Sequence, residues 1–357
     1  MAEQLFYKNV PIFGIDIGFG TVKVVNLLTD TANASNPLLL GYGVGVFDSS
    51  AVEAGIIVKP STVAESIYKL ISKQMTGYVA TKSIAVTIPI SQSFVRTIEI
   101  PDVKESELDD AVKFEIEQSV PLPMAELYLD YEVTNTDHGT GIYEVLTVAI
   151  SQKIVDSYLR LFELLDLDPI LVEPSMSAIA RAVNHDYKLD RPVLILDMGS
   201  HQADLSIYDK TIRVTATAVN GSDDITIAIA KTLKITRRQA FMVKTKYGIK
   251  QDSKYYQQIK VPIDVVLSPL IGEINKIVRY YRLRSNLIIK DIIVVGGGSS
   301  FPGFPDYIAE QTKLAITLYD PWRLIQPNGL QSPHALERPL FTTAIGSALA
   351  GLEKKHD

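Results

Sequence analysis

A short acidic, glycine-rich corner near the start of the chain has the residue types that hold phosphate and a divalent cation. An apolar stretch ends in Asp16, and the chain then turns on two glycines and leaves through Thr21 and Lys23. Because glycine has no Cβ, the N–H groups of Gly18 and Gly20 can approach an anion closely, and a carboxylate beside phosphates is a normal ligand of Mg²⁺. Taken alone, the pattern fits an ordinary tight hairpin better.

The second half of the chain repeats this plan. Residues 192–201 place a buried strand, Asp197, Gly199 and a polar turn in the same order as residues 12–20. Two further strand-like segments follow in both halves, so the agreement covers both order and chemistry. We infer an internal duplication, with a chance repeat as the alternative.

A third glycine-rich segment follows a strongly hydrophobic stretch. Residues 291–295 predict a buried strand, which runs into three glycines and a serine at 296–299. Missing side chains let a flat group lie against the backbone, and the helix predicted over 305–311 offers its N-terminus to an anion. A flexible corner is the alternative, but together with the two acidic corners the segment favours a bound ligand.

The composition excludes several classes of function. The 357 residues are enough for two or three domains, and a hydrophobic content of 46% can fill their cores. A net charge of −6 argues against general nucleic-acid binding, and the absence of cysteine excludes disulfides, thiolate metal sites and cysteine nucleophiles. No signal-peptide pattern and no apolar run near the ~20 residues of a membrane span are present. We expect a cytoplasmic protein whose membrane role, if it has one, is peripheral or through a partner.

Hydrophobic periodicity predicts the elements that position these corners. Strands are expected over 12–17, 21–28 and 37–46 in the first half and over 192–196, 203–208 and 211–219 in the second, with helices over 61–75, 153–165 and 223–233. Between the halves, strands over 83–88 and 93–101, a helix over 104–119 and a hairpin (128–134 and 142–150, with its loop at 137–141) predict a small inserted domain within 83–150. Ser106 and Asp109 have capping-box spacing at the start of that helix.

The three motifs, in this order, resemble those of the actin-like ATPase superfamily, which includes actin, heat-shock chaperone ATPases, sugar kinases and FtsA. They are Gly-Ile-Asp-Ile-Gly at 14–18, Leu-Asp-Met-Gly at 196–199 and Val-Val-Gly-Gly-Gly-Ser at 294–299. The resemblance implies an α/β, actin-like two-lobed fold with duplicated ribonuclease-H-like cores and a small inserted α+β subdomain. It also implies that the lobes close on ATP and Mg²⁺.

Carried over to this chain, the resemblance implies a set of binding residues. Asp16 and Asp197 would hold Mg²⁺, and the phosphates and nucleoside would contact Gly18, Phe19, Gly20, Thr21, Lys23, Gly199, Ser200, His201, Gly221, Lys244, Gly296, Gly297, Gly298 and Ser299. Phe241 stands where the family has a glutamate that accepts hydrogen bonds from ribose, and Ala203 where a hydroxyl residue is common. No residue stands out as the one that positions an attacking water, so we expect nucleotide binding, with at most a weak ATPase activity.

The stretch between the two halves narrows the resemblance. Residues 93–101, 105–108, 114–123 and 129–131 are similar to the inserted subdomain of the PilM family, the cytoplasmic actin-like components of type IV pilus assembly, and residues 172–175, 178–182 and 344–346 also match. The resemblance implies a nucleotide-dependent adaptor of a pilus or related type II secretion machine. A groove beside the inserted subdomain would bind the cytoplasmic N-terminal tail of a PilN-like bitopic inner-membrane protein. The protein would also contact other pilus assembly proteins and could associate with itself.

The alternative is a filament-forming membrane tether like FtsA, which is expected to end in a linker and an amphipathic helix. Residues 351–357 form a short polar tail instead, which favours the adaptor. A sugar kinase would need a catalytic aspartate that the sequence does not reveal. The segments expected are a first-lobe core at 1–82, the inserted subdomain at 83–150, a connection at 151–191, a second lobe at 192–335 and a C-terminal helix at 336–357, which returns to the first lobe.

Overall fold

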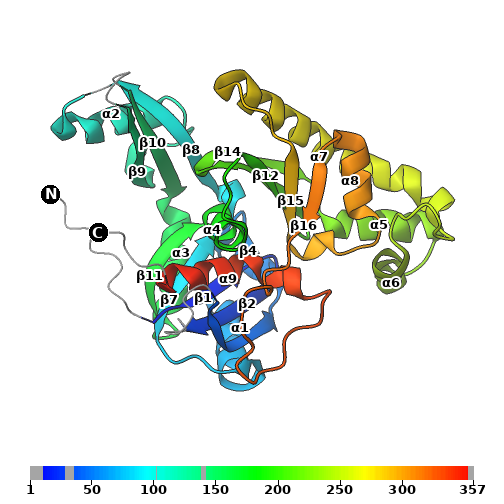
Figure 1. Cartoon of the computed structure of the whole chain (residues 1–357). Coiled ribbons are helices and arrows are strands. Elements are labelled where there is room, and N and C mark those ends of the chain that lie inside the picture. The colour runs from blue at the N-terminus through cyan, green and yellow to red at the C-terminus, as the bar shows by residue number, and fades with distance from the viewer. Residues whose placement is uncertain (1–10, 29–35, 102, 138–141, 353–357) are drawn as a thin grey trace. The chain divides into compact units, whose positions relative to one another are not determined.

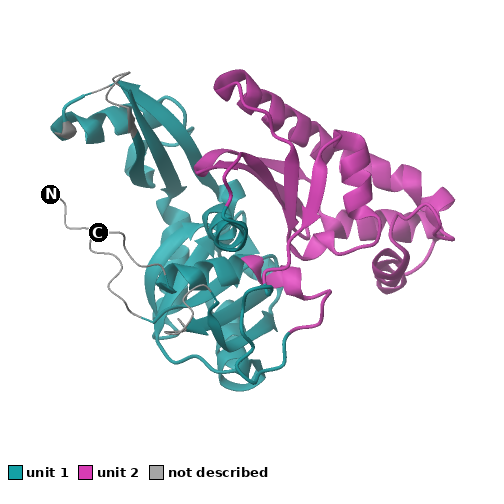
Figure 2. Ribbon diagram, in the orientation of Figure 1, with its two compact units in different colours: residues 1–188, 322–332, 343–357 teal, residues 189–321, 333–342 magenta. Residues whose placement is uncertain are grey.

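The computed structural model describes residues 11–28, 36–101, 103–137 and 142–352 (Figure 1). The N-terminal residues 1–10, most of the predicted hairpin loop (138–141) and the tail at 353–357 lie outside these ranges. The chain forms two compact units (Figure 2): residues 1–188 with 322–332 and 343–357, and residues 189–321 with 333–342. The finer division into five segments stays a prediction.

The first unit contains a six-stranded sheet in the order β11-β7-β1-β2-β3-β6. Its strands are β1 (Phe13–Ile17), β2 (Thr21–Leu28), β3 (Leu38–Val46), β6 (Thr76–Gly77), β7 (Ser83–Ile88) and β11 (Asp168–Pro174). The first three form an antiparallel meander, and β7 pairs with β1 in parallel. The strands predicted over 12–17, 21–28, 37–46 and 83–88 are confirmed. A short hairpin of β4 (Val52–Glu53) and β5 (Ile56–Ile57) is separate from this sheet.

Helices cover both faces of this sheet. On one face, α1 (Pro60–Lys69) and α3 (Gln152–Glu163) pack against Phe13, Ile15 and Ile17. The predicted helix over 61–75 is confirmed, with its last turns wound as a π-helix, η2 (Leu70–Gln74). On the other face, α9 (Thr342–Leu349) approaches so closely that a Cβ at Gly14 would lie 2.0 Å from the carbonyl oxygen of Ala344. Gly14 is therefore required by packing. Helix α4 (Ser175–Tyr187) contacts β7 and β11.

The stretch from β8 to β10 folds into a small sheet covered by one helix, whereas the strand over 83–88, which was predicted to belong to the inserted domain, is β7 of the six-stranded sheet. Strands β8 (Ser93–Pro101), β10 (Ile142–Ser151) and β9 (Leu127–Asp137) are antiparallel, and α2 (Glu105–Glu117) packs Val112 and Ile116 against Ile100 and Val145. The predicted capping box is wrong. The N-cap residue is Lys104, without a side-chain hydrogen bond, because the helix begins before Ser106 and leaves that serine inside its first turn.

The second unit contains a sheet in the order β16-β15-β12-β13-β14. Its strands are β12 (Val193–Met198), β13 (Gln202–Asp209), β14 (Thr211–Val219), β15 (Asp291–Val295) and β16 (Ala315–Leu318). Its helices are α5 (Ser222–Leu233), α6 (Arg237–Tyr247), α7 (Tyr256–Ser285) and α8 (Phe304–Thr312). The predicted strands and the helices over 223–233 and 305–311 are confirmed. Leu194, Leu196 and Met198 of β12 belong to a core that includes residues of all four helices.

Short 3-10 turns complete the described chain: η1 (Ser49–Ala51), η3 (Ile90–Gln92), η4 (Met124–Glu126), η5 (Gly297–Ser299), η6 (Arg338–Phe341) and η7 (Ala350–Leu352). Within the described ranges, no helix combines the length and the apolar character needed to cross a bilayer.

The acidic corners of the two units have the same backbone geometry, as an internal duplication predicts. Asp16 lies opposite Lys23 in the β1-β2 hairpin, and Asp197 lies opposite Asp204 in the β12-β13 hairpin. The Gly18 N–H donates to the carbonyl of Thr21 at 2.8 Å, and the Gly199 N–H donates to that of Gln202 at 3.0 Å. Each first strand also pairs in parallel with the strand on its other side, β7 or β15. The two halves therefore share both turn and sheet context.

Candidate functional site

The corner of the first unit is built around an ion pair. Lys23 Nζ lies 2.9 Å from Asp16 Oδ2, and both side chains are largely buried. The Thr87 hydroxyl, on the parallel neighbour β7, donates weakly to Asp16 Oδ1 at 3.4 Å. Lys23 was predicted to contact phosphate, but here its ammonium neutralises the carboxylate that was predicted to hold the metal. A metal-bound phosphate at this corner would therefore have to share or separate this pair.

Two glycines give the same turn a backbone conformation and a free space that other residues would not allow. Gly20 has a φ of +92°, a region that favours glycine, and its carbonyl accepts a hydrogen bond from the Phe47 N–H at 3.0 Å. A Cβ at Gly18 would lie 3.0 Å from Lys23 Nζ, so this glycine leaves room for the lysine. Phe19, at the tip, is exposed. Thr21 opens β2 and is partly buried.

A buried tyrosine lies near the first corner. The Tyr158 hydroxyl of α3 is fully buried and makes no hydrogen bond with the residues that the structure describes. Burial, with a smaller effect of the negative charge of Asp16, raises the pKa of the Tyr158 hydroxyl above its ordinary value. The phenol is therefore neutral, and its dry surroundings strengthen the field of the Asp16 carboxylate on that side.

The corner of the second unit carries a second carboxylate where the first unit has its lysine. Asp204 is buried on β13, opposite Asp197, and accepts hydrogen bonds from Gln202 Nε2 at 3.0 and 3.1 Å and from Thr217 Oγ1 at 2.7 Å. Burial raises the pKa of Asp204, although these neutral donors oppose the shift. The second corner thus has two carboxylates on neighbouring strands, an arrangement that suits a cation.

The glycine run after β15 packs directly on this second corner. A Cβ at Gly296 would lie 2.1 Å from Asp197 Oδ1, and one at Gly298 would lie 2.5 Å from the Met198 carbonyl oxygen. A Cβ at Gly297 would lie 2.2 Å from Leu340 Cδ2. The Ser299 hydroxyl donates to the Gly296 carbonyl at 2.7 Å and closes the turn. These glycines thus have a packing reason within the chain, and their contact with a nucleoside stays a prediction.

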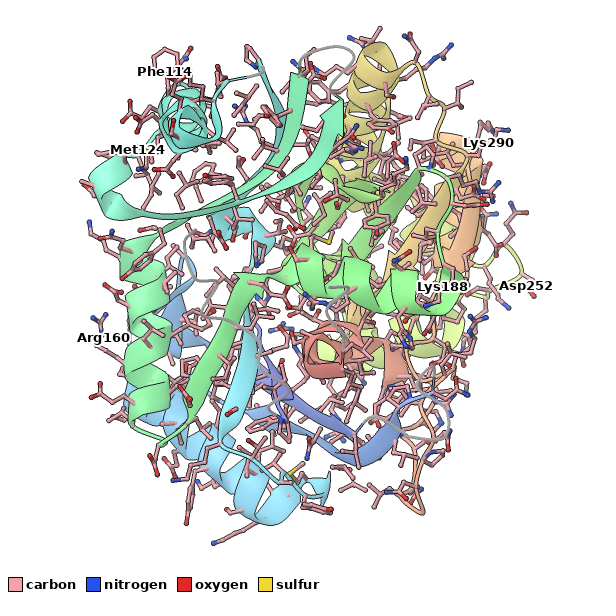
Figure 3. All side chains as sticks on the ribbon, turned by 60° about the vertical axis from the view of Figure 1, so that its left-hand side comes forward. Phe114, Met124, Arg160, Lys188, Asp252 and Lys290 are labelled. Carbon is pink, nitrogen blue, oxygen red and sulfur yellow. The ribbon has the colours of Figure 1, made fainter. Side chains whose placement is uncertain are left out.

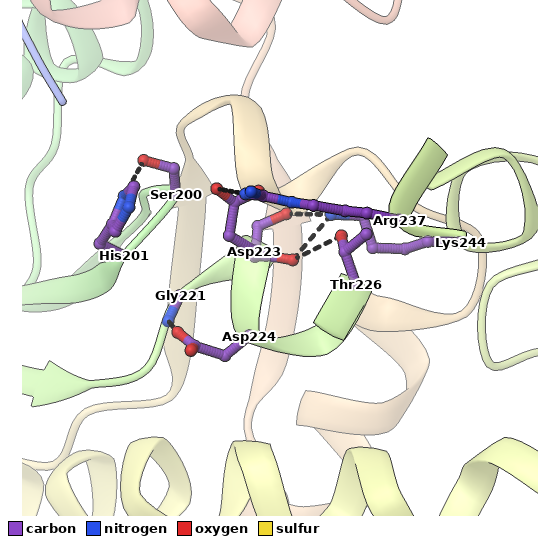
Figure 4. Close-up of polar contacts among 9 residues, drawn as sticks. Ser200, His201, Gly221, Asp223, Asp224, Thr226, Arg237 and Lys244 are labelled. Atoms are coloured by element: carbon purple, nitrogen blue, oxygen red, sulfur yellow. Dashed lines mark hydrogen bonds and ion pairs between the residues drawn. The ribbon is translucent and has the colours of Figure 1, made fainter. Parts of the chain in front are cut away.

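The N-terminus of α5 is held against the second turn (Figure 4). The Ser222 N–H donates to the Gly199 carbonyl at 3.0 Å, and the Asp223 N–H donates to the Ser200 carbonyl at 2.8 Å. A Cβ at Gly221 would lie 2.3 Å from the Ser200 carbonyl oxygen, so only glycine fits at this crossing. The structure therefore brings a helix N-terminus, whose partial positive charge favours anions, to the turn predicted to bind phosphate.

Some polar groups of this turn form hydrogen bonds with one another. Ser200 Oγ and His201 Nδ1 are 2.8 Å apart, and both side chains are exposed (Figure 4). The Asp224 carboxylate accepts a hydrogen bond from the Gly221 N–H at 2.8 Å and so caps α5. The exposed turn therefore presents a hydroxyl and an imidazole to solvent.

Lys244 of α6 is buried beneath this helix N-terminus. Its Nζ donates to Ser222 Oγ at 2.6 Å and to the Ser222 carbonyl at 2.8 Å. Loss of hydration on burial lowers the pKa of Lys244 to about 8, with a smaller opposing effect from Asp223. Phe241, one turn earlier, is exposed, and its ring centroid is 5.4 Å from Lys244 Nζ. Lys244 ties α6 to α5 and adds positive charge near the turn.

The lowered pKa of Lys244 predicts a stability that rises with pH. The unfolded chain keeps the lysine proton until about pH 10, so above about pH 8 the folded protein binds fewer protons than the unfolded chain and gains stability. Between about pH 7 and pH 9, wild type should gain about 1 kcal/mol relative to Lys244→Met. Urea unfolding of both proteins at these pH values measures this difference. Parallel pH profiles would show that Lys244 keeps an ordinary pKa when folded.

The donor chemistry of the two acidic corners fits Mg²⁺. Asp16 and Asp197 end corresponding strands and carry carboxylate oxygens, which are the ligands that this hard cation takes together with water and phosphate. Within the described ranges, no group of three or more His, Asp or Glu side chains is arranged to hold a metal ion. The residues therefore suit a hydrated ion held by few protein ligands rather than an all-protein cage.

Two residues beside the site were not predicted from the sequence. Asp204 could have been found from the repeat, because it follows Asp197 by seven residues (204 − 197), the spacing between Asp16 and Lys23. The role of Ser222 had no such signal, since only the packing of α6 on α5 brings Lys244 to it. All predicted binding residues of the first half lie in the first unit, and all those of the second half lie in the second.

Known proteins resemble this chain over nearly its whole length. The cell division protein FtsA of Streptococcus pneumoniae serotype 2 is 22% identical over 362 residues, which cover 90% of this chain and 77% of FtsA. The structure of a PilM-PilN type IV pilus biogenesis complex matches with a TM-score of 0.81 and 21% identity, covering 97% of this chain and 100% of that one. MreB5 of Spiroplasma citri bound to AMPPNP matches with a TM-score of 0.55 and 10% identity, covering 96% of both chains.

These similarities establish the actin-like two-lobed α/β fold that the three motifs predicted. The model of one family, that of the type IV pilus assembly protein PilM, matches residues 14–352, which include both acidic corners, the inserted sheet and helix, and the glycine run. The chain belongs to the PilM family of type IV pilus assembly proteins.

Proposed function

We propose that this protein is an ATP-binding adaptor on the cytoplasmic side of a type IV pilus or related type II secretion machine. The observation that carries the nucleotide part is the repeated acidic corner, with the same hairpin geometry in both units. In the proposed complex, Asp16 and Asp197 hold Mg²⁺ while the two glycine turns and the α5 N-terminus contact the phosphates. Bound ATP then selects one arrangement of the units.

Two features favour binding over rapid hydrolysis. Phosphoryl transfer to water needs a group that orients the attacking water, and none is evident among the described residues around either corner. The ion pair between Lys23 and Asp16 also opposes fast metal exchange at the first corner, because it has to open first. We therefore propose that the nucleotide serves as a structural ligand. A similar protein, MreB5, has a crystal structure bound to AMPPNP.

The partner that we propose is the cytoplasmic tail of a PilN-like inner-membrane protein, docked on the inserted subdomain. One similar structure is that of a PilM-PilN complex. The exposed side of α2 carries the acidic residues Glu107, Asp109, Asp110 and Glu117, of which Asp109 pairs with Lys113. Cytoplasmic segments next to a membrane span carry an excess of Lys and Arg. Charge complementarity thus suits such a tail, and steering should make its association sensitive to salt.

The inserted subdomain also offers an exposed aromatic anchor. Phe114 of α2 is 62% exposed and is labelled in Figure 3, on the side of the helix away from the buried Val112 and Ile116. Exposed aromatic side chains are common anchors in protein interfaces. We propose that Phe114 contacts apolar residues of the bound tail.

Phe114→Ser is expected to weaken binding of a fluorescent PilN-like tail peptide by about tenfold, in line with the loss of one interface anchor. The matched control is Tyr68→Ser, on α1 of the same unit, where the ring is 63% exposed. Fluorescence anisotropy with and without Mg-ATP measures both affinities. Absence of saturable binding by wild type in either condition would reject the proposed partner.

The similarity to FtsA keeps a second function open, that of a filament-forming membrane tether. Such a protein assembles into polymers that sediment when ATP is added. Ultracentrifugation and negative-stain electron microscopy of the purified protein with Mg-ATP distinguish the two functions. We expect no polymer under conditions in which the tail peptide binds.

A further inference from the structure

The end of α7 and the five residues after it form a basic and apolar surface, the α7-end surface. Its basic residues are Lys276, Arg279, Arg282, Arg284 and Lys290. Its exposed apolar residues are Tyr280, Leu283, Leu287 and Ile288. Residues 274–290 contain no acidic residue, although the whole chain has a net charge of −6. The α7-end surface is therefore a local concentration of positive charge on an acidic protein.

The fold holds these side chains in place. Tyr281 is buried in the core, and its hydroxyl donates to Asp209 Oδ2 at 2.6 Å, which fixes the rotation of α7 at this point. Asn286, with a φ of +57°, ends the helix, and the buried Ile289 anchors the chain after it. Leu283 and Ile288 are left 74% and 59% exposed between these two anchors. These two exposed side chains therefore lie on a segment that buried residues on either side hold in place.

Most of the positive charge of this surface is not cancelled by its neighbours. Glu273 pairs with Lys276 of the surface at 3.3 Å, whereas Asp291 pairs with Arg191, outside the surface, at 3.1 Å. Arg284 lies over the ring of Tyr280, 5.2 Å from its centroid. Among the described residues, Arg282 and Lys290 form no ion pair, and Figure 3 shows Lys290 at the edge of the second unit. These cations remain available to an external anion.

We propose that the α7-end surface binds the anionic headgroup layer of a phospholipid membrane. Lys and Arg near such a layer gain from its negative potential, while Tyr, Leu and Ile side chains enter the boundary between headgroups and acyl chains. The apolar residues project from a helix end, a convex shape that suits a soft headgroup layer. This contact goes beyond the proposed adaptor function and lies in the unit that does not carry the inserted subdomain. It lies at the interface and requires no membrane-spanning segment.

The test is sedimentation of the full-length protein with vesicles. We expect it to pellet with equimolar phosphatidylglycerol and phosphatidylcholine vesicles and to remain in solution with phosphatidylcholine alone. Arg282→Glu with Arg284→Glu should reduce the bound fraction at least about tenfold, because it replaces two attractive charges by repulsive ones. Leu283→Ser with Ile288→Ser should also reduce it several-fold, since binding by charge alone would not need these side chains.

A charge-matched control is Lys231→Glu with Lys234→Glu, two exposed lysines of the same unit at the end of α5. It should bind vesicles like wild type. Circular dichroism and the PilN-like peptide assay show whether each variant keeps its fold and its inserted-subdomain function. Wild type that stays in solution with anionic vesicles would overturn the proposal and point to an acidic protein as the occupant of this surface. Vesicle binding that survives Arg282→Glu with Arg284→Glu would also overturn it, because the membrane contact would then lie elsewhere on the protein.

Discussion

Replacement of Asp197 by asparagine is expected to weaken Mg-dependent ATP binding by about 10- to 100-fold, because one charge-assisted contact contributes about 1.5–3 kcal/mol and each 1.4 kcal/mol is a factor of ten. Asparagine has the same shape, and the close packing of Gly296 against Asp197 Oδ1 can be kept. The fold should therefore survive. Isothermal titration calorimetry with ATP, with and without Mg²⁺, measures the loss.

Asp16→Asn should also remove the Mg²⁺ dependence, but with a different secondary effect. It frees Lys23 from its ion pair, so the lysine can contact phosphate directly and binding without metal should improve. The control is Asp190→Asn, an exposed position just before β12, which should leave binding unchanged. If both corner variants bind Mg-ATP like wild type, neither aspartate is a metal ligand.

Replacement of Arg181 by methionine is expected to lower the stability of the protein by about 3–5 kcal/mol, the usual effect of removing one partner of a buried ion pair. Arg181 of α4 makes two 2.7 Å hydrogen bonds to the carboxylate of Glu173, which is 6% exposed, and a third of 2.9 Å to the Gly346 carbonyl. Without the guanidinium, the Glu173 charge stays buried and unpaired. The melting temperature should fall by roughly 10 °C.

The double variant Glu173→Leu with Arg181→Met should recover much of this loss, because no buried charge remains. Lys69→Met provides the contrast, since it removes an exposed pair with Glu65 on α1 and should change stability by less than about 1 kcal/mol. Differential scanning calorimetry of the three variants measures these effects. A loss for Arg181→Met as small as that for Lys69→Met would mean that this pair is not what joins α4 to β11 and α9.

The local elements could be predicted wherever a periodic pattern lay between clear breakers. β2, β7, β8 and β14 begin and end as predicted, because each is a short β-branched or alternating run between turn residues. Helix α7 was not predicted, since Pro262 and Pro269 lie inside its 30 residues. Each proline removes a backbone hydrogen bond, but the buried stripe from Ile259 to Tyr281 packs into the core and outweighs that loss.

The two acidic corners, their repetition and the glycine run could be predicted from the sequence, because they depend on local turn chemistry and on one aligned order of residues. The contacts around them depend largely on how the chain folds. Packing placed Gly296 on the Asp197 carboxylate and Lys244 against Ser222, whereas the hairpin pairs Asp16–Lys23 and Asp197–Asp204 follow from strand register. Contacts between residues far apart in the chain depend on how strands and helices pack, and spacing along one sequence carries no information about that packing.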